Sequence, residues 1–234
     1  MAPQRESYMA IVGGLLWLAN MTRFDIAYAS SQLARFISNP GPAQMRAAVR
    51  VLIYLRDSAD RDLVYSPDPT RPLVAFVDSS WLSGFSCSGA FLFFFGCPFH
   101  WFAKTQRSVT LSSAEAEFFG AMIAAKDVIF SRDLLIDLGI AIESATEILS
   151  DSKSAVDMAF DPVAFKKTKH ILRAAEFLRD LVARQVVTLR HVKGVIMLAD
   201  ILTKGTARAI FLELLSLLDS YSTSGEESLS SSSD

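Results

Sequence analysis

The chain has 234 residues, of which 51% are hydrophobic, and its formal net charge at pH 7 is -2. This length is enough for one good hydrophobic core, or for one core and a small accessory unit. Proteins dedicated to duplex binding are usually basic overall, so the net charge argues mildly against nucleic acid, and the local distribution of charge matters more.

The chain contains two cysteines, Cys87 and Cys97. Their spacing fits neither a zinc site nor a disulfide scaffold, so we expect two small buried side chains in a reducing compartment. The apolar run of residues 9–19 is about half as long as the ~20 residues of a membrane-spanning helix. The Phe-rich run of residues 90–103 contains Pro98 and His100. We therefore expect buried strands there, and no contact with a membrane.

Three zones follow one another along the chain. Residues 1–68 are helical in pattern, with one helix ending at the breaker Asn39-Pro40-Gly41-Pro42 and a second helix over residues 43–56. Residues 69–218 alternate between strand and helix signals, which predicts an α/β domain with helices on a mixed sheet. Residues 219–234 are rich in Ser and Glu and predict a disordered tail.

Within the middle zone each expected element has its own pattern. A hairpin turn is expected at Gly96-Cys97-Pro98, and Gly139 is expected to close a long helix. The strands are expected at residues 73–77, 90–95, 100–103, 147–150 and 186–192, and the helices at 113–138, 168–184 and 198–218.

Four acids lie in apolar surroundings. Asp78 and Asp151 each follow an apolar strand, Asp200 lies within an apolar helix, and Glu117 lies among small and aromatic residues. A buried carboxylate is costly unless its charge is offset, and divalent ions such as magnesium, which prefer oxygen ligands, would offset it. Each acid alone could instead cap a helix or stabilise a turn, so the interpretation depends on the set of four.

The two neighbouring glutamates have different expected roles. Ser112 and Glu115 form the S-x-x-E pattern of a capping box, which gives Glu115 a structural role at the start of the helix. Glu117 lies about 200° around the helix from Glu115, so the two cannot share a face. We therefore assign the metal-binding role to Glu117.

Five short segments occur in a characteristic order: VDSSW (77–81), LSSAEAEF (111–118), SDSKSA (150–155), KTKHI (167–171) and LADILTK (198–204). Their order and spacing resemble the ribonuclease H domain of copia-type retrotransposon Pol polyproteins. Residues 8–18 and 23–29 resemble the end of the reverse transcriptase in the same polyproteins. The chain departs from the pattern at Ser80, where the family has a second acid, and at Gly205, where it has proline.

The resemblance implies a ribonuclease H-like α/β fold, in which helices flank a mixed five-stranded sheet and the N-terminal segment forms a helical appendage. It implies an endonuclease that hydrolyses the RNA strand of RNA–DNA hybrids, with the reverse transcriptase portion of the polyprotein as a partner. Two Mg²⁺ or Mn²⁺ ions, about 4 Å apart, would be held by four catalytic acids: Asp78, Glu117, Asp151 and Asp200. We expect a cytoplasmic location, in a virus-like particle, or a nuclear one.

Basic residues gather in one stretch. Residues 163–194 contain eight Lys or Arg and two acids, which is the charge pattern expected for phosphate contacts, although a solvated helix face would give it too. The residues predicted to bind nucleic acid are Lys104, Lys167, Lys169, His170 and Lys193.

Other interpretations stay open. The chain could be a catalytically inactive retroelement remnant that at most binds nucleic acid, or a related nuclease or integrase of the same fold class. An aspartic protease is suggested by Asp78-Ser79 and Asp151-Ser152, but neither pair is followed by the Gly that the protease turn requires.

Overall fold

The computed structural model describes residues 2–82, 85–106, 110, 112–160 and 169–224. The N-terminal segment is helical, as predicted. It consists of α1 (Ala2–Met21), the short 3-10 helix η1 (Phe24–Ile26), α2 (Ala27–Ala34) and α3 (Pro42–Asp57). Pro42 occupies the first position of α3, where its missing N–H costs nothing, and Gly41 N donates to Gln44 Oε1 at 3.1 Å. The break at residues 39–42 is thereby confirmed.

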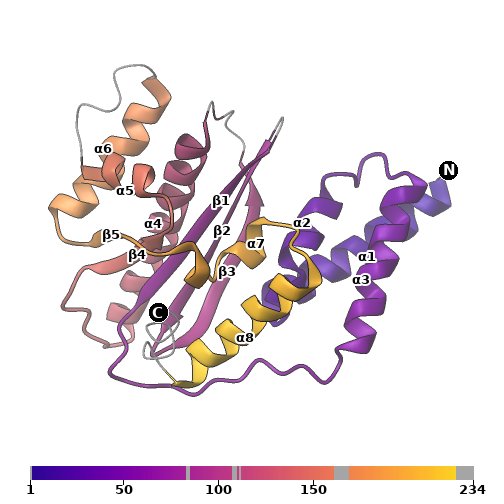
Figure 1. Ribbon diagram of the computed structural model, residues 1–234, viewed down its shortest axis with the longest axis horizontal. Coiled ribbons are helices and arrows are strands. Elements are labelled where there is room, and N and C mark those ends of the chain that lie inside the picture. The colour runs from indigo at the N-terminus through magenta and orange to yellow at the C-terminus, as the bar shows by residue number, and fades with distance from the viewer. Residues whose placement is uncertain (1, 83–84, 107–109, 111, 161–168, 225–234) are drawn as a thin grey trace.

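One mixed sheet of five strands forms the centre of the molecule (Figure 1), in the order β3-β2-β1-β4-β5. The strands are β1 (Val74–Leu82), β2 (Phe85–Phe94), β3 (Cys97–Thr105), β4 (Thr146–Ser150) and β5 (Val187–His191). β1, β2 and β3 pair antiparallel, whereas β4 and β5 run parallel to β1. The predicted mixed five-stranded sheet is confirmed.

The predicted hairpin joins β2 to β3. Its two turn residues, Phe95 and Gly96, have φ of 53° and 77°. Positive φ at both central residues is typical of the type I′ turn, a two-residue hairpin turn whose twist matches that of the paired strands. The turn therefore begins one residue before the predicted Gly96-Cys97-Pro98.

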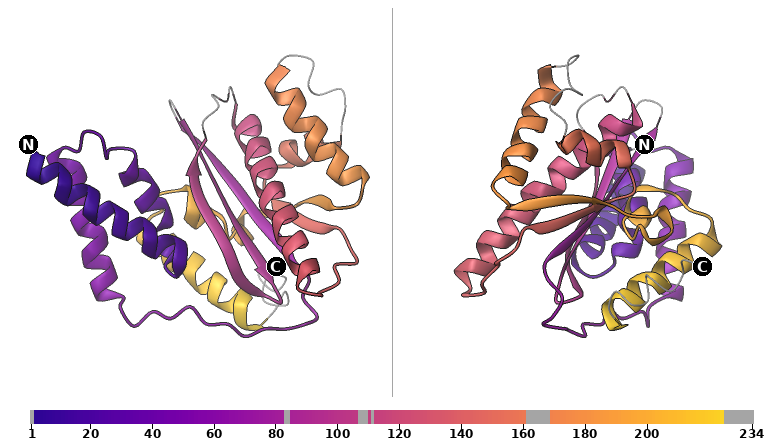
Figure 2. Two further views of the ribbon diagram at one scale, coloured as in Figure 1. Left: turned by 180° about the vertical axis from the view of Figure 1, so that it is seen from behind. Right: turned by 60° about the vertical axis from the view of Figure 1, so that its left-hand side comes forward.

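Helices cover both faces of the sheet (Figure 2). α4 (Ser113–Asp137), α5 (Lys153–Phe160) and α6 (Lys169–Ala183) lie on one side, and α1 to α3 with α8 (Arg208–Ser224) lie on the other. The start and end of α4 are confirmed, since Ser112 Oγ accepts from Glu115 N at 3.2 Å and Gly139 has φ of 81°. α5 had not been predicted.

Two C-terminal predictions are wrong. The single helix expected over residues 198–218 is split into α7 (Asp200–Thr203) and α8. The disordered tail was expected to begin at residue 219, but residues 219–224 continue α8, because Tyr221 packs into the core with 2% of its surface exposed. The rest of the predicted tail lies outside the described residues.

Alternating residues of β1 enter two hydrophobic clusters. Ala75 and Val77 pack with the helices α4 to α6, whereas Val74 and Phe76 pack with the N-terminal helices and α8. The predicted boundary between residues 68 and 69 falls in the extended connection from α3 to β1. The cluster that contains Val74 and Phe76 includes residues on both sides of this boundary. The N-terminal helices therefore share a core with the sheet.

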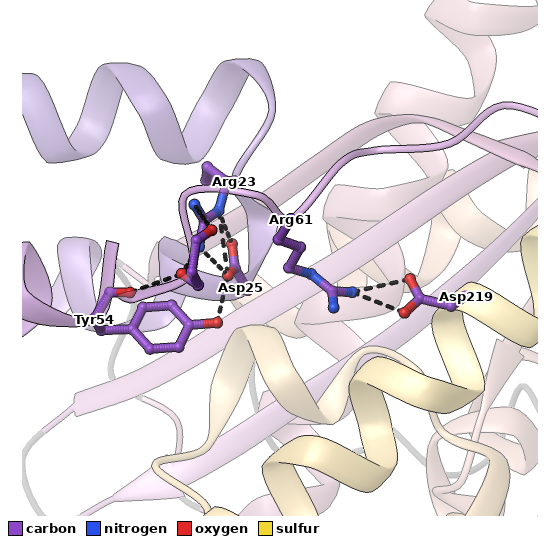
Figure 3. A network of polar contacts seen from close by, with 6 residues as sticks. Arg23, Asp25, Tyr54, Arg61 and Asp219 are labelled. Carbon is purple, nitrogen blue, oxygen red and sulfur yellow. Dashed lines mark hydrogen bonds and ion pairs between the residues drawn. The ribbon is translucent and has the colours of Figure 1, made fainter. Parts of the chain in front are cut away.

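Polar contacts join the same parts. Asp25 accepts from Arg23 at 2.8 Å and from the Tyr54 hydroxyl at 2.6 Å, which ties η1 to α3 (Figure 3). Arg61 Nη2 donates to Asp219 Oδ1 of α8 at 2.9 Å. These contacts hold the end of α3 and the connection after it against the rest of the domain. Within the described part of the chain, none of the helices combines the length and apolar character of a membrane span.

Candidate active site

Asp78 lies in the middle of β1 rather than at the end of a strand, as had been predicted, and it is fully buried. β1 continues to Leu82 because β2 pairs with it as far as Phe85. Thr203 Oγ1 donates to Asp78 Oδ2, and the Lys204 ammonium lies 3.2 Å from Asp78 Oδ1. Both oxygens of the carboxylate therefore have partners from α7 and its C-cap.

The end of β4 opens a gap beside Asp78. The parallel pairing of β4 with β1 covers only residues 74–76 of β1, and β4 ends at Ser150. Asp151, the next residue, therefore lies beside Asp78. Ser79 N, which has no residue of β4 opposite it, donates to Glu117 Oε2 of α4 at 3.0 Å. The loss of a strand neighbour thus creates the place where the acids meet.

Three of the four predicted acids converge at this gap. Asp78, Glu117 and Asp151 each offer one carboxylate oxygen, and these oxygens lie within 4.8 Å of one another. Asp200 adjoins them through Lys204, whose ammonium lies 2.7 Å from Asp200 Oδ1 as well as near Asp78. Among the described residues the group contains Glu117 and not Glu115. The catalytic and metal-binding roles of the four acids remain predictions.

Burial and mutual repulsion disfavour the charged form of these acids. Burial, followed by the charges of Asp78 and Asp151, raises the pKa of Glu117 to about 9. Burial and the charge of Asp78 raise the pKa of Asp151, and the same two causes raise the pKa of Asp200 to about 6. Burial alone would lower the pKa of Lys204, but Asp78 and Asp200 outweigh it and raise that pKa.

Two glycines permit the close packing around the acids. Gly89 lies directly opposite Asp78 on β2, and a Cβ there would come within 2.5 Å of Leu202 Cβ and 2.9 Å of Thr203 Cγ2. A Cβ at Gly120 would come within 2.2 Å of Ser79 Oγ. Without a side chain at these positions, α7 and α4 can approach the sheet closely enough to bring their acids to β1.

Comparison with known proteins places this arrangement in a family. The Pol polyprotein of transposon RE2 from Arabidopsis thaliana is 30% identical over 213 residues, which is 89% of this chain and 15% of that protein. The Pol polyprotein of transposon TNT 1-94 from Nicotiana tabacum is 30% identical over 87% of this chain and 16% of its own length. The chain is homologous to a segment of the retrovirus-related Pol polyproteins of transposons. No family model matches it.

The chain therefore spans about 15% of the length of the Pol polyproteins that it matches. Among solved structures it is similar to LC11-RNase H1 in complex with an RNA/DNA hybrid. That similarity has a TM-score of 0.44 and 15% identity, and covers 56% of this chain and 93% of the solved one.

The predicted nucleic-acid residues of this Pol segment are only partly described. Lys104 is exposed on β3. Lys193 is exposed two residues after the end of β5 and next to Gly194, where an added Cβ would lie 3.5 Å from Asp151 Oδ2. Lys167 lies outside the described residues, and Lys169 and His170 are described only as the first two residues of α6.

Part of the predicted basic stretch has structural contacts. Arg190 forms an ion pair with Glu147 at 2.9 Å, Arg184 forms one with Asp180 at 3.1 Å, and Arg179 donates to the carbonyl of Met158. These contacts favour a structural role for the three arginines.

Sequence reasoning did not assign roles to Thr203, Lys204 or Gly89. Asp200 and Lys204 are four residues apart, and an acid and a lysine at that spacing on a helix form ion pairs. That spacing was the available signal for Lys204. The contacts of Thr203 and Lys204 with Asp78 depend on how α7 packs on β2, which no local pattern specifies.

Proposed function

We propose that this segment of the Pol polyprotein is a metal-dependent ribonuclease H, an endonuclease that hydrolyses the RNA strand of RNA–DNA hybrids. The observation that carries the proposal is the convergence of Asp78, Glu117 and Asp151, with Asp200 beside them, at the gap between β1 and β4. Nucleases of this kind need no protein nucleophile, because water attacks the phosphorus. Hydrolysis breaks the P–O3′ bond and leaves a 5′ phosphate and a 3′ hydroxyl.

The acids suit divalent metal ions. Carboxylate oxygens are the ligands that Mg²⁺ and Mn²⁺ prefer, and the oxygens of three acids already lie within 4.8 Å of one another. The raised pKa of Glu117 is a sign of negative charge that is not fully offset. Asp78, Glu117, Asp151 and Asp200 would hold two ions, which when bound supply an activated water and stabilise the leaving oxygen.

The surrounding protein would keep the acids in position. Asp78 is fixed by pairing of β1 on one side and by Thr203 on the other, and Glu117 is oriented by Ser79 N. Lys104 and Lys193, both exposed, would contact phosphates of the hybrid. Recognition would depend on the minor-groove shape and 2′-hydroxyls of the hybrid, since base sequence is not expected to matter.

The direct test is a cleavage assay on a hybrid whose RNA strand carries a 5′ fluorophore, with double-stranded DNA and double-stranded RNA as controls. We expect the hybrid alone to be cut, with Mg²⁺ or Mn²⁺ and not in EDTA. Retention of the hybrid in a gel-shift assay, without cleavage at any metal concentration, would contradict the proposal and identify an inactive remnant that still binds nucleic acid.

A further inference from the structure

The Lys204 ammonium occupies a specific place in the acid cluster. It lies 3.2 Å from Asp78 Oδ1 and 2.7 Å from Asp200 Oδ1, and so bridges the acid of the central strand and the acid of α7. One lysine thus contacts two of the four carboxylates directly.

The position of Lys204 combines a fixed backbone with a movable side chain. Leu202 and Thr203, directly before it, are fully buried against β2, and Lys204 N donates to Asp200 O at 3.0 Å at the end of α7. The Lys204 side chain is nevertheless 39% exposed. Its ammonium could therefore move into solvent without uncovering the hydrophobic core.

We propose that Lys204 is a built-in counter-cation, which holds Asp78 and Asp200 together when no metal is bound and competes with metal ions for Asp78. The inference rests on the proposed metal-dependent function. Both Asp78 oxygens already accept contacts, one from Thr203 and one from Lys204. An ammonium and a divalent cation on one carboxylate repel each other strongly in a buried site, so metal binding has to displace Lys204 from Asp78.

Competition makes a reciprocal prediction. Because Lys204 and metal ions each weaken the binding of the other, removal of the ammonium should tighten metal binding by the same factor that the metal loosens the lysine. A purely structural lysine would have the opposite effect, because its loss would disorder the site and weaken metal binding. The direction of the change in metal affinity therefore separates the two roles.

The experiment compares Lys204→Met with Lys126→Met, which removes the same charge from an exposed position nine residues beyond Glu117 on α4. Metal binding is measured by titration calorimetry with Mg²⁺ and Mn²⁺, without nucleic acid, at constant pH and ionic strength. We expect Lys204→Met to bind metal roughly tenfold more tightly than the wild type. We expect Lys126→Met to bind as the wild type does.

Thermal unfolding gives a second readout. In EDTA, Lys204→Met should unfold about 5 °C below the wild type, because the carboxylates lose their counter-charge. Addition of Mg²⁺ should remove this difference in unfolding temperature. Lys204→Arg, which keeps the charge, should resemble the wild type in both measurements.

A measurement on the wild-type protein does not depend on whether a variant folds. In lysine-labelled protein, the Cε–Hε NMR signal of Lys204 should shift on addition of Mg²⁺, while that of Lys126 stays in place. An unmoved Lys204 signal under saturating Mg²⁺, or metal binding by Lys204→Met that is no tighter than in the wild type, overturns the inference and leaves the proposed function standing. No metal binding by any of these proteins would instead remove the proposed function, and the inference with it.

Discussion

Replacement of Glu117 by Gln should stabilise the metal-free protein at neutral pH. Glu117 has 9% of its surface exposed and lies with its carboxylate next to two other acids, so its charged form is disfavoured in the folded chain. Gln has nearly the same shape, can still accept from Ser79 N through its carbonyl oxygen, and can donate from its amide to the neighbouring carboxylates. The substitution therefore removes the charge and keeps the packing.

The size and sign of the effect follow from the pKa of Glu117, which is about 9 in the folded chain against an ordinary value of 4.5. A carboxyl group whose pKa is raised by folding contributes stability that is complete below its unfolded pKa and is lost as the pH rises through the folded pKa. At pH 7 Glu117 is protonated in the folded chain and ionised in the unfolded chain, whose pKa of 4.5 lies about 2.5 units below this pH. This difference lowers the free energy of unfolding by up to about 3 kcal/mol.

The measurement is urea denaturation in EDTA, at several pH values from 4 to 9, for the wild type, Glu117→Gln and Glu115→Gln. We expect the gain of Glu117→Gln to be near zero at pH 4 and to rise to about 3 kcal/mol at pH 7. Glu115→Gln, the matched control at the start of α4, should lose roughly 0.5–1 kcal/mol. A Glu117→Gln protein that is less stable than the wild type at pH 7, or whose gain is the same at every pH, would show that the Glu117 carboxylate is not destabilised by its surroundings.

The remaining predictions concern single substitutions. In the hybrid-cleavage assay, Asp151→Asn should abolish activity, whereas Asp200→Asn on the short helix α7 should reduce it less and recover partly with extra Mg²⁺. Gly89→Ala should lower the free energy of unfolding by about 1–3 kcal/mol, because the added methyl group overpacks against Leu202, and it should slow cleavage because α7 is displaced. Gly14→Ala, with open space around it in α1, should do neither. Phe24→Ala should cost about 3–5 kcal/mol in a single unfolding transition, because Phe24 packs edge-on against Phe91 and Trp101 of the sheet; two separate transitions would contradict the shared core.

The sequence pattern predicted the sheet well because its strands are nearly continuous apolar runs. Strands buried on both faces show such runs, and residues 90–94 of β2 are the clearest example. The first half of β2 is buried too, but it contains Ser86, Ser88 and Gly89 and was not predicted as strand. The same reasoning placed Asp78 at the end of a strand, since a charge is unfavourable in a buried run. In fact β1 continues as far as β2 pairs with it, and the buried Asp78 is accommodated by a hydrogen bond from Thr203 and the counter-charge of Lys204.

Packing partners could not be predicted from local patterns. The spacing of apolar residues indicates that α1 has a buried face, formed by Tyr8, Val12 and Leu15, but not that α1 packs against α2 and α3. Likewise, the choice of Glu117 over Glu115 followed from helix geometry, whereas the role of Lys204 depends on the contact of α7 with Gly89. Distances along the chain do not specify contacts of this kind.

We propose that the acids around Asp78 make this Pol segment a metal-dependent ribonuclease H. The sharpest test is cleavage of a labelled RNA–DNA hybrid in Mg²⁺ by the wild type and by Asp78→Asn, with thermal unfolding of both proteins to show that the variant folds. We expect cleavage by the wild type, none in EDTA, and none by a folded Asp78→Asn protein. A folded Asp78→Asn protein that cleaves the hybrid as fast as the wild type would rule out this role of the acids.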